Sequence, residues 1–437
     1  MTQISQQLRN KVMLIREPVA TGKTAAIGFW FSTGSRSEPD NLRGVTHFVE
    51  HMLFKGTSSR SSFDIASAFD RMGGYVNAFT EREAVCMYCV VPSVHVEKAL
   101  EILCDMTSHS SFNNADIQRE KQVIKSEIIT AQDDPEEASL DAVGEAVWPD
   151  QKISASISGS IADVEKLAQD DLYAWYEKRF VRGPLTVCIT GNYNADSITG
   201  ILEMLPEHTA HVRWSDEHEE NQLLKQTPVW KSGLNFIRAP FQQEQFFVLY
   251  PVAYPVSEKL YFTFAVLNAI SGGTMSSRLF QRLREKGGFC YTVDSFFSYY
   301  EDTGCWCVYA SSAKQESVRI ISDIRMELND LFLHSITDAE LDAAKEHVCG
   351  EEMIASEDVE YRMKRLARSY QSGYTVRTTE DIIEIFRSIQ KADIEEAVKM
   401  LFNDEKASVV VFGPKLKASE KQKIKGLCAC KTPGEKK

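Results

Sequence analysis

Three polar residues interrupt an otherwise apolar stretch, residues 44–54 (GVTHFVEHMLF), which should form a buried helix. His47 and His51 are four positions apart, so both imidazoles lie on one helix face and can bind one metal ion. Glu50 projects beside the same place, where a carboxylate can accept a proton from metal-bound water without binding the metal. The alternative, hydrogen-bonded core histidines, is weaker because three polar groups would be buried together. The spacing predicts a hydrolytic metal site.

A catalytic zinc site needs a third protein ligand, and the predicted helix over residues 115–132 offers two candidates. Glu120 and Glu127 share a stripe with Ile117 and Ile124, so both carboxylates should face inward and need a cation or a donor. We expect one to bind the metal and the other to support a ligand or water, and the spacing does not decide which. If the stripe is only partly buried, both glutamates instead reach water.

The elements that position these residues follow an order that the chain repeats. The first half predicts a strand, two helices, a hairpin, three helices and a strand over residues 25–32, 45–54, 63–72, 75–91, 94–106, 115–132, 170–179 and 185–190. The second half repeats it over residues 246–250, 261–270, 277–286, 291–297, 305–311, 316–331, 338–355, 391–401 and 408–412. Residues 115–127 align with 339–351 without a gap, which indicates internal duplication.

The repeat predicts an α+β fold with two homologous domains, each an antiparallel sheet covered by helices. The chain of 437 residues is also too long for one ordinary core. We expect a zinc-binding catalytic domain over residues 1–207, a polar linker over 208–227, and a second domain over 228–437. The second half has no His-x-x-Glu-His, so each chain should carry one zinc ion.

With these motifs, the chain resembles the pitrilysin/insulinase family of inverted zincins over about residues 11–414, most closely the small bacterial members and the β subunit of mitochondrial processing peptidase. The resemblance implies the fold of that peptidase, with zinc held by His47, His51 and Glu127. It implies Glu50 as general base and Glu120, seven positions before Glu127, as an assisting catalytic residue.

The resemblance also implies residues that contact a peptide substrate. Phe54 would line the pocket for the residue after the scissile bond. Asn77 and Ala78, in the run GGYVNAFT, would lie on an edge strand that pairs with the substrate backbone. Arg284 and Tyr291 correspond to an Arg and a Tyr that contact the substrate near the scissile carbonyl in this family, where donors would stabilise the oxyanion. Both residues lie in the second domain, which would complete the substrate chamber.

Two acidic residues suggest a sequence preference. Glu137 and Asp141 are four positions apart on the helical segment after Pro135. In processing peptidases the corresponding acids bind an arginine of the substrate near the cut, which implies cleavage near basic residues. Paired acids on a solvated helix face are also common, so this alternative stays open.

Composition excludes several classes. The formal net charge of −13 argues against a nucleic-acid partner. No run of about eighteen apolar residues is present, so we expect no membrane span. The start lacks the apolar core of a secretory signal, and the ten cysteines suggest no disulfide framework. We therefore expect a cytoplasmic protein.

The function predicted from these observations is a zinc metalloendopeptidase that hydrolyses oligopeptides or unfolded segments inside an enclosed chamber. Short members of the family resemble half of the long single-chain enzymes, which implies a homodimer in which Arg284 and Tyr291 could serve either zinc. Two alternatives stay open: a non-catalytic peptide-binding or assembly subunit, and a zinc hydrolase acting on something other than peptides. Manganese or cobalt could occupy the same ligands.

Overall fold

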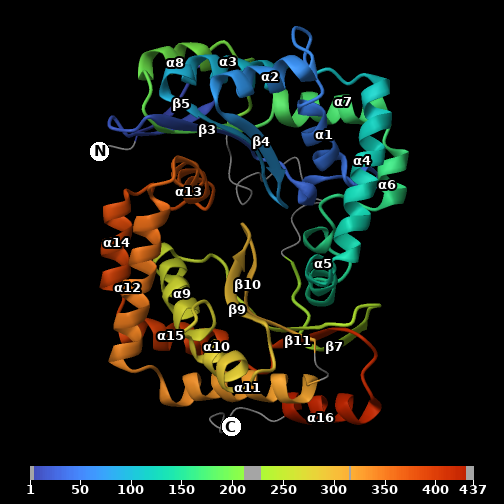
Figure 1. Ribbon diagram of the computed structural model, residues 1–437, viewed down its shortest axis with the longest axis vertical. Coiled ribbons are helices and arrows are strands. Elements are labelled where there is room, and N and C mark those ends of the chain that lie inside the picture. Colours follow the sequence, from blue (N-terminus) through green and yellow to red (C-terminus); the bar gives the residue numbers. More distant parts are fainter. Residues whose placement is uncertain (1–3, 211–227, 314–315, 430–437) are drawn as a thin grey trace. The chain divides into compact units, whose positions relative to one another are not determined.

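The computed structural model describes residues 4–210, 228–313 and 316–429, which divide into two compact units (Figure 1). The described residues of unit 1 lie within 4–131, 155–210 and 354–378, and those of unit 2 within 132–154, 228–353 and 379–429. Each unit combines most of one half of the chain with a short segment from the other half. Residues 211–227 of the predicted linker lie outside the described residues.

Unit 1 is built on a six-stranded sheet with the order β1-β2-β6-β3-β5-β4. Its strands are β1 (Ile4–Gln7), β2 (Met13–Pro18), β3 (Thr24–Phe31), β4 (Tyr75–Thr80), β5 (Val85–Pro92) and β6 (Leu185–Gly191). Neighbouring strands are antiparallel except for the parallel pair β2–β6. Because β4 is the last strand of the order, one side of its backbone lies at the edge of the sheet.

Helices cover both faces of this sheet. In Figure 1, α3 and α8 lie on one side and α13 on the other. The α-helices of unit 1 are α1 (Val45–Leu53), α2 (Ser62–Met72), α3 (Val96–His109), α4 (Asn114–Asp133), α6 (Ile161–Lys166), α7 (Gln169–Tyr176), α8 (Ala195–Leu202) and α13 (Val359–Gln371). Shorter segments are η1 (Ser35–Ser37), η2 (Asp40–Leu42), η3 (Ser93–His95) and the π-helical η5 (Glu177–Val181). The main core includes Phe29, Phe48, Leu103 and Tyr176.

Unit 2 contains a five-stranded sheet with the order β7-β11-β8-β10-β9. Its strands are β7 (Gly233–Arg238), β8 (Glu244–Pro251), β9 (Thr292–Tyr299), β10 (Gly304–Ser312) and β11 (Ser408–Gly413). Its helices are α5 (Pro135–Val147), η4 (Lys152–Ser154), α9 (Glu258–Ser271), α10 (Arg278–Phe280), η6 (Gln281–Lys286), α11 (Ser317–His334), α12 (Asp338–Ala355), α14 (Thr379–Ser388), α15 (Lys391–Leu401) and α16 (Ala418–Ala429). None of the described helices is long and apolar enough to span a membrane.

The two sheets share one topology. The order β2-β6-β3-β5-β4 recurs as β7-β11-β8-β10-β9. This confirms the predicted α+β fold with two homologous sheets covered by helices. The prediction that each sheet is antiparallel is wrong in one detail. Each sheet contains one parallel pair of strands, β2–β6 in unit 1 and β7–β11 in unit 2. A parallel pair needs a long crossover connection, and these strands stand at opposite ends of their repeats.

A helix from the other half of the chain covers the second face of each sheet. In unit 1, α13 packs on β3 and β6, and its Met363 and Leu366 are buried with Trp30. In unit 2, α5 packs on β8 and β11, and its Val143 is buried with Phe247. The sequence patterns did not predict α13. We call this arrangement the helix exchange.

Candidate metal centre

The helix that carries the two histidines starts at a glycine with a left-handed backbone. Gly44 has a φ of 82°, and a Cβ atom there would lie 2.5 Å from the carbonyl oxygen of Ser158. The buried Glu38 carboxylate accepts hydrogen bonds from the backbone N–H groups of Gly44 and Thr46, each at 2.7 Å. A carboxylate at a helix N-terminus also interacts favourably with the helix dipole. Sequence reasoning missed Glu38. The only signal for it in the sequence is its position as an acidic residue shortly before the helix.

Apolar residues on α1 and α4 fix which side chains face each other. Five fully buried residues anchor α1, namely Val45, Phe48, Val49, Met52 and Leu53. Ile117, Ile124 and Ile128 anchor α4 in the same core. Glu120 is buried beside these isoleucines, whereas the side chain of Glu127 is 48% exposed. The predicted stripe is therefore present, and its last glutamate lies at the edge of the buried region.

Two imidazoles and one carboxylate converge in unit 1. His47, His51 and Glu127 each offer a ligand atom, and these three atoms all lie within 4.8 Å of one another. Glu127 Oε2 lies 3.3 Å from His51 Nε2 and 4.0 Å from His47 Nε2. This donor set suits zinc, for which two imidazoles and a carboxylate leave a fourth position open. The residues present therefore fit the metal that the sequence predicted.

The surroundings of His47 lower its pKa and so favour its neutral form. Burial, and then the neighbouring His51, lower the pKa of His47 to about 3. His47 therefore has a lone pair available for a metal at neutral pH. Within the described residues its buried Nδ1 has no hydrogen-bond partner.

Glu50 lies on α1 beside this cluster. Burial raises the pKa of its carboxyl group, while a hydrogen bond from Thr80, the charge of His51 and that of Glu127 have smaller effects. Thr80 Oγ1, at the end of β4, donates to Glu50 Oε2 at 2.5 Å. A raised pKa brings a carboxylate closer to the value that a general base needs near neutral pH. Sequence reasoning did not find Thr80.

Glu120 contacts the His51 ring at the nitrogen that does not face Glu127. Its Oε2 lies 3.2 Å from His51 Nδ1, and its Oε1 lies 2.7 Å from Lys55 Nζ. The geometry thus places Glu127 among the ligand atoms and Glu120 next to the far nitrogen of His51. The division of roles that the family resemblance implied stays a prediction.

The edge strand β4 carries Asn77 and Ala78. The backbone N–H of Ala78 donates to Asn77 Oδ1 at 2.8 Å, so this amide has a side-chain acceptor at the sheet edge. A peptide strand added there could supply a carbonyl oxygen instead. Phe54 is the residue directly after α1, and it packs partly buried against the core of unit 1.

The other predicted site residues belong to unit 2. Arg284 lies over the ring of Tyr291, with its guanidinium carbon 5.2 Å from the ring centroid, and Tyr291 is 80% exposed. Glu137 and Asp141 are exposed on α5. The structure therefore brings Arg284 and Tyr291 together, and the substrate roles of all four residues stay predictions.

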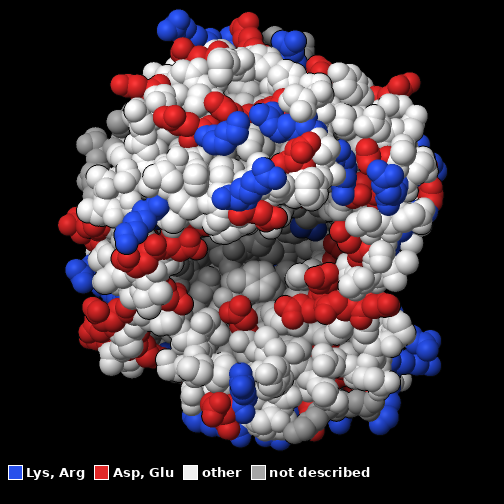
Figure 2. Space-filling model, turned by 45° about the horizontal axis from the view of Figure 1, so that its top comes forward, with Lys and Arg blue, Asp and Glu red and all other residues white. Residues whose placement is uncertain are grey.

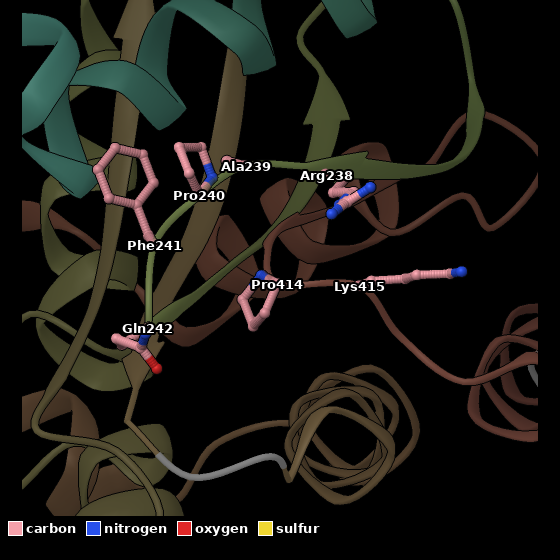
Figure 3. Close-up of a pocket in the computed structure, with 7 residues that line it drawn as sticks. All are labelled: Arg238, Ala239, Pro240, Phe241, Gln242, Pro414 and Lys415. Atoms are coloured by element: carbon pink, nitrogen blue, oxygen red, sulfur yellow. The ribbon is translucent and has the colours of Figure 1, made fainter.

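The surface and one pocket give further information. On the face shown in Figure 2, Lys and Arg side chains lie next to Asp and Glu side chains. A pocket of about 420 Å³ lies in unit 2 and is lined by residues 238–242, Pro414 and Lys415. Figure 3 shows Phe241 on one side of this pocket and the cationic side chains of Arg238 and Lys415 on the other. It contains none of the predicted site residues.

Comparison with known proteins identifies the family of this chain. Residues 11–160 match the family model for insulinase, peptidase family M16, and residues 166–348 match that for the peptidase M16 inactive domain. A Bacillus subtilis protein described as an uncharacterised zinc protease is 30% identical over 92% of this chain and 96% of its own length. A Rickettsia felis protein with the same description is 30% identical over 93% and 97%.

Solved structures share the fold. A peptidase M16 inactive domain from Pseudomonas fluorescens superposes with a TM-score of 0.83 at 16% identity, covering 95% of this chain and 98% of that one. A protease from Helicobacter pylori gives a TM-score of 0.83 at 18% identity, covering 94% and 99%. Since both family models and the full-length relatives agree, this chain belongs to the M16, or insulinase, family of peptidases.

Proposed function

We propose that this protein is a zinc-dependent endopeptidase whose metal is held by His47, His51 and Glu127. The observation that carries the proposal is the convergence of these three ligand groups beside the buried carboxylate of Glu50. The relatives described as zinc proteases support both the metal and the reaction.

Zinc bound at this site would acidify a water molecule and polarise the scissile carbonyl. Glu50 would accept a proton from the attacking water and pass it to the leaving amine. Thr80 would hold the Glu50 carboxylate in one orientation through its hydrogen bond. Glu120 would accept a hydrogen bond from His51 Nδ1, which leaves His51 Nε2 free as a ligand atom.

The substrates proposed are oligopeptides or unfolded polypeptide segments. An extended peptide paired with the backbone of β4 would be held through its main chain, which tolerates many sequences. Four further features stay predictions, namely an enclosed chamber, a homodimer, a cytoplasmic location and a preference for basic residues near the cut. The exposed acids Glu137 and Asp141 support the last of these.

The test compares the wild type with Glu50→Gln, measuring zinc content and hydrolysis of a mixed library of quenched peptides. Glu97→Gln, an exposed glutamate on α3, is the matched control. We expect zinc in all three proteins and hydrolysis in the wild type and the control. Glu50→Gln should lose at least about a hundredfold in rate, the usual contribution of a general base.

Two outcomes would contradict the proposal. Equal hydrolysis by the wild type and Glu50→Gln would remove Glu50 from the reaction. Peptide binding without hydrolysis, unchanged after a chelator removes the metal, would favour the alternative of a non-catalytic peptide-binding subunit. The chain has all three ligand groups and the buried Glu50 carboxylate beside them, which supports catalysis over that alternative.

A further inference from the structure

Lys55 lies in the turn that follows α1, four positions after His51, and its ammonium group reaches α4. Lys55 Nζ lies 2.7 Å from Glu120 Oε1, and Glu120 Oε2 lies 3.2 Å from His51 Nδ1. On the other side of the imidazole, His51 Nε2 lies 3.3 Å from Glu127 Oε2. These four side chains form a continuous line that runs from a cation to the proposed zinc ligands.

In this arrangement the charge of Lys55 balances the charge of the Glu120 carboxylate. The side chain of Glu120 is only 6% exposed, and a buried carboxylate without a cation is costly. The other partner of Glu120 is His51, which must be neutral to bind a metal. Among the described residues, Lys55 is therefore the one cation paired with Glu120.

The turn that carries Lys55 is held in place. The backbone N–H of Lys55 donates to the carbonyl oxygen of Met52 at 3.1 Å, which continues the end of α1. The following loop is tied to α3, because Asp105 accepts hydrogen bonds from Thr57 at 2.6 Å and Ser59 at 3.0 Å and pairs with Arg60. A fixed turn lets Lys55 meet Glu120 with little loss of side-chain freedom on metal binding.

We propose that Lys55 is a positioning residue for the metal site. It compensates the charge of Glu120, so that Glu120 accepts the hydrogen bond of His51 Nδ1–H and His51 Nε2 keeps its lone pair for zinc. Sequence reasoning assigned no role to Lys55. This inference rests on the proposed zinc site.

The experiment measures the zinc dissociation constant of the full chain by competition with a chromophoric chelator. Lys55→Met keeps the length of the side chain and removes its charge. Groups that support metal ligands typically change metal affinity by 10- to 100-fold, so we expect the dissociation constant to rise by roughly that factor. Lys55→Arg should restore most of the affinity. Lys98→Met, on an exposed pair with Glu101, is the matched control and should match the wild type.

A second background separates this role from general packing. Glu120→Gln replaces the carboxylate by a neutral amide, which needs no cation. We therefore expect Lys55→Met to change zinc affinity much less in the Glu120→Gln protein than in the wild type. Circular dichroism checks the fold of each variant, and Lys55→Gln takes the place of Lys55→Met if the latter does not fold.

The outcomes are distinct. Wild-type zinc affinity in Lys55→Met, or an equal loss in both backgrounds, would overturn the role of Lys55. A wild type that binds no zinc would instead overturn the proposed function on which the inference rests.

Discussion

The helix exchange predicts that one methionine of α13 stabilises a sheet formed by the first half of the chain. Met363 is fully buried in a cluster with Trp30 and Cys188, and Trp30 Nε1 donates to its sulfur at 3.3 Å. Truncating a buried methionine to alanine costs about 2–5 kcal/mol. Met363→Ala also leaves the indole N–H without this acceptor, which adds about 1 kcal/mol. We therefore expect a total loss of about 3–6 kcal/mol.

Hydrogen exchange followed by mass spectrometry can locate this loss. Where exchange reports the opening free energy, a loss of 3 kcal/mol speeds exchange by about a hundredfold, since each 1.4 kcal/mol is roughly a factor of ten. We expect this acceleration in β3 and β6, on which α13 packs, and little change in β8 and β10 of unit 2.

Two further variants make the prediction sharp. Met363→Leu keeps the volume and loses only the sulfur acceptor, so it should cost less than about 1.5 kcal/mol. Met204→Ala removes the same side chain at a position that is 74% exposed and should change exchange very little. If Met363→Ala and Met204→Ala exchange at the same rate in β3 and β6, α13 does not stabilise that sheet as described.

Three other predictions follow from single contacts. Gly44→Ala forces a Cβ atom against the carbonyl oxygen of Ser158 in a left-handed backbone, so zinc content and melting temperature should both fall, and an unchanged protein would refute the clash. Ala78→Pro removes an edge amide that donates to a side chain, so kcat/KM for peptides should fall roughly 2- to 10-fold with the fold intact, and an unaltered kcat/KM would argue against substrate pairing there. The ion pair with Arg278 lowers the pKa of Glu340 to about 2, so the pair stabilises unit 2 above about pH 4.5 and loses this effect as the pH falls towards 2. The difference in unfolding free energy between wild type and Arg278→Ala, measured in denaturant titrations, should therefore shrink between pH 4.5 and 2. A difference that does not depend on pH would contradict this prediction.

Local patterns predicted the elements that carry the site. The helix with His47 and His51 and the stripe with Glu120 could be recognised because helical spacing fixes which side chains share a face. The edge strand β4 was expected from the family resemblance, and its place at the end of the sheet agrees with that expectation.

Long-range contacts could not be predicted in this way. Trp30 and Met363 are 333 positions apart, so no local pattern reveals that α13 covers β3. The parallel pair β2–β6 likewise depends on pairing between distant strands. Lys55 and Glu38 have ordinary sequence surroundings, and only their distances to Glu120 and to the start of α1 show what they contact.

The helix exchange also has a consequence for the order in which the chain is synthesised. When the first half has left the ribosome, its sheet still lacks α13, whose last residue is Gln371, and α5 still lacks β8 and β11. The nascent chain therefore exposes apolar faces, around Trp30 on the sheet and Val143 on α5, until most of the second half has been translated. Two fragments cut between residues 210 and 228 should for the same reason be insoluble apart and fold when produced together, each supplying the helix that completes the other's sheet.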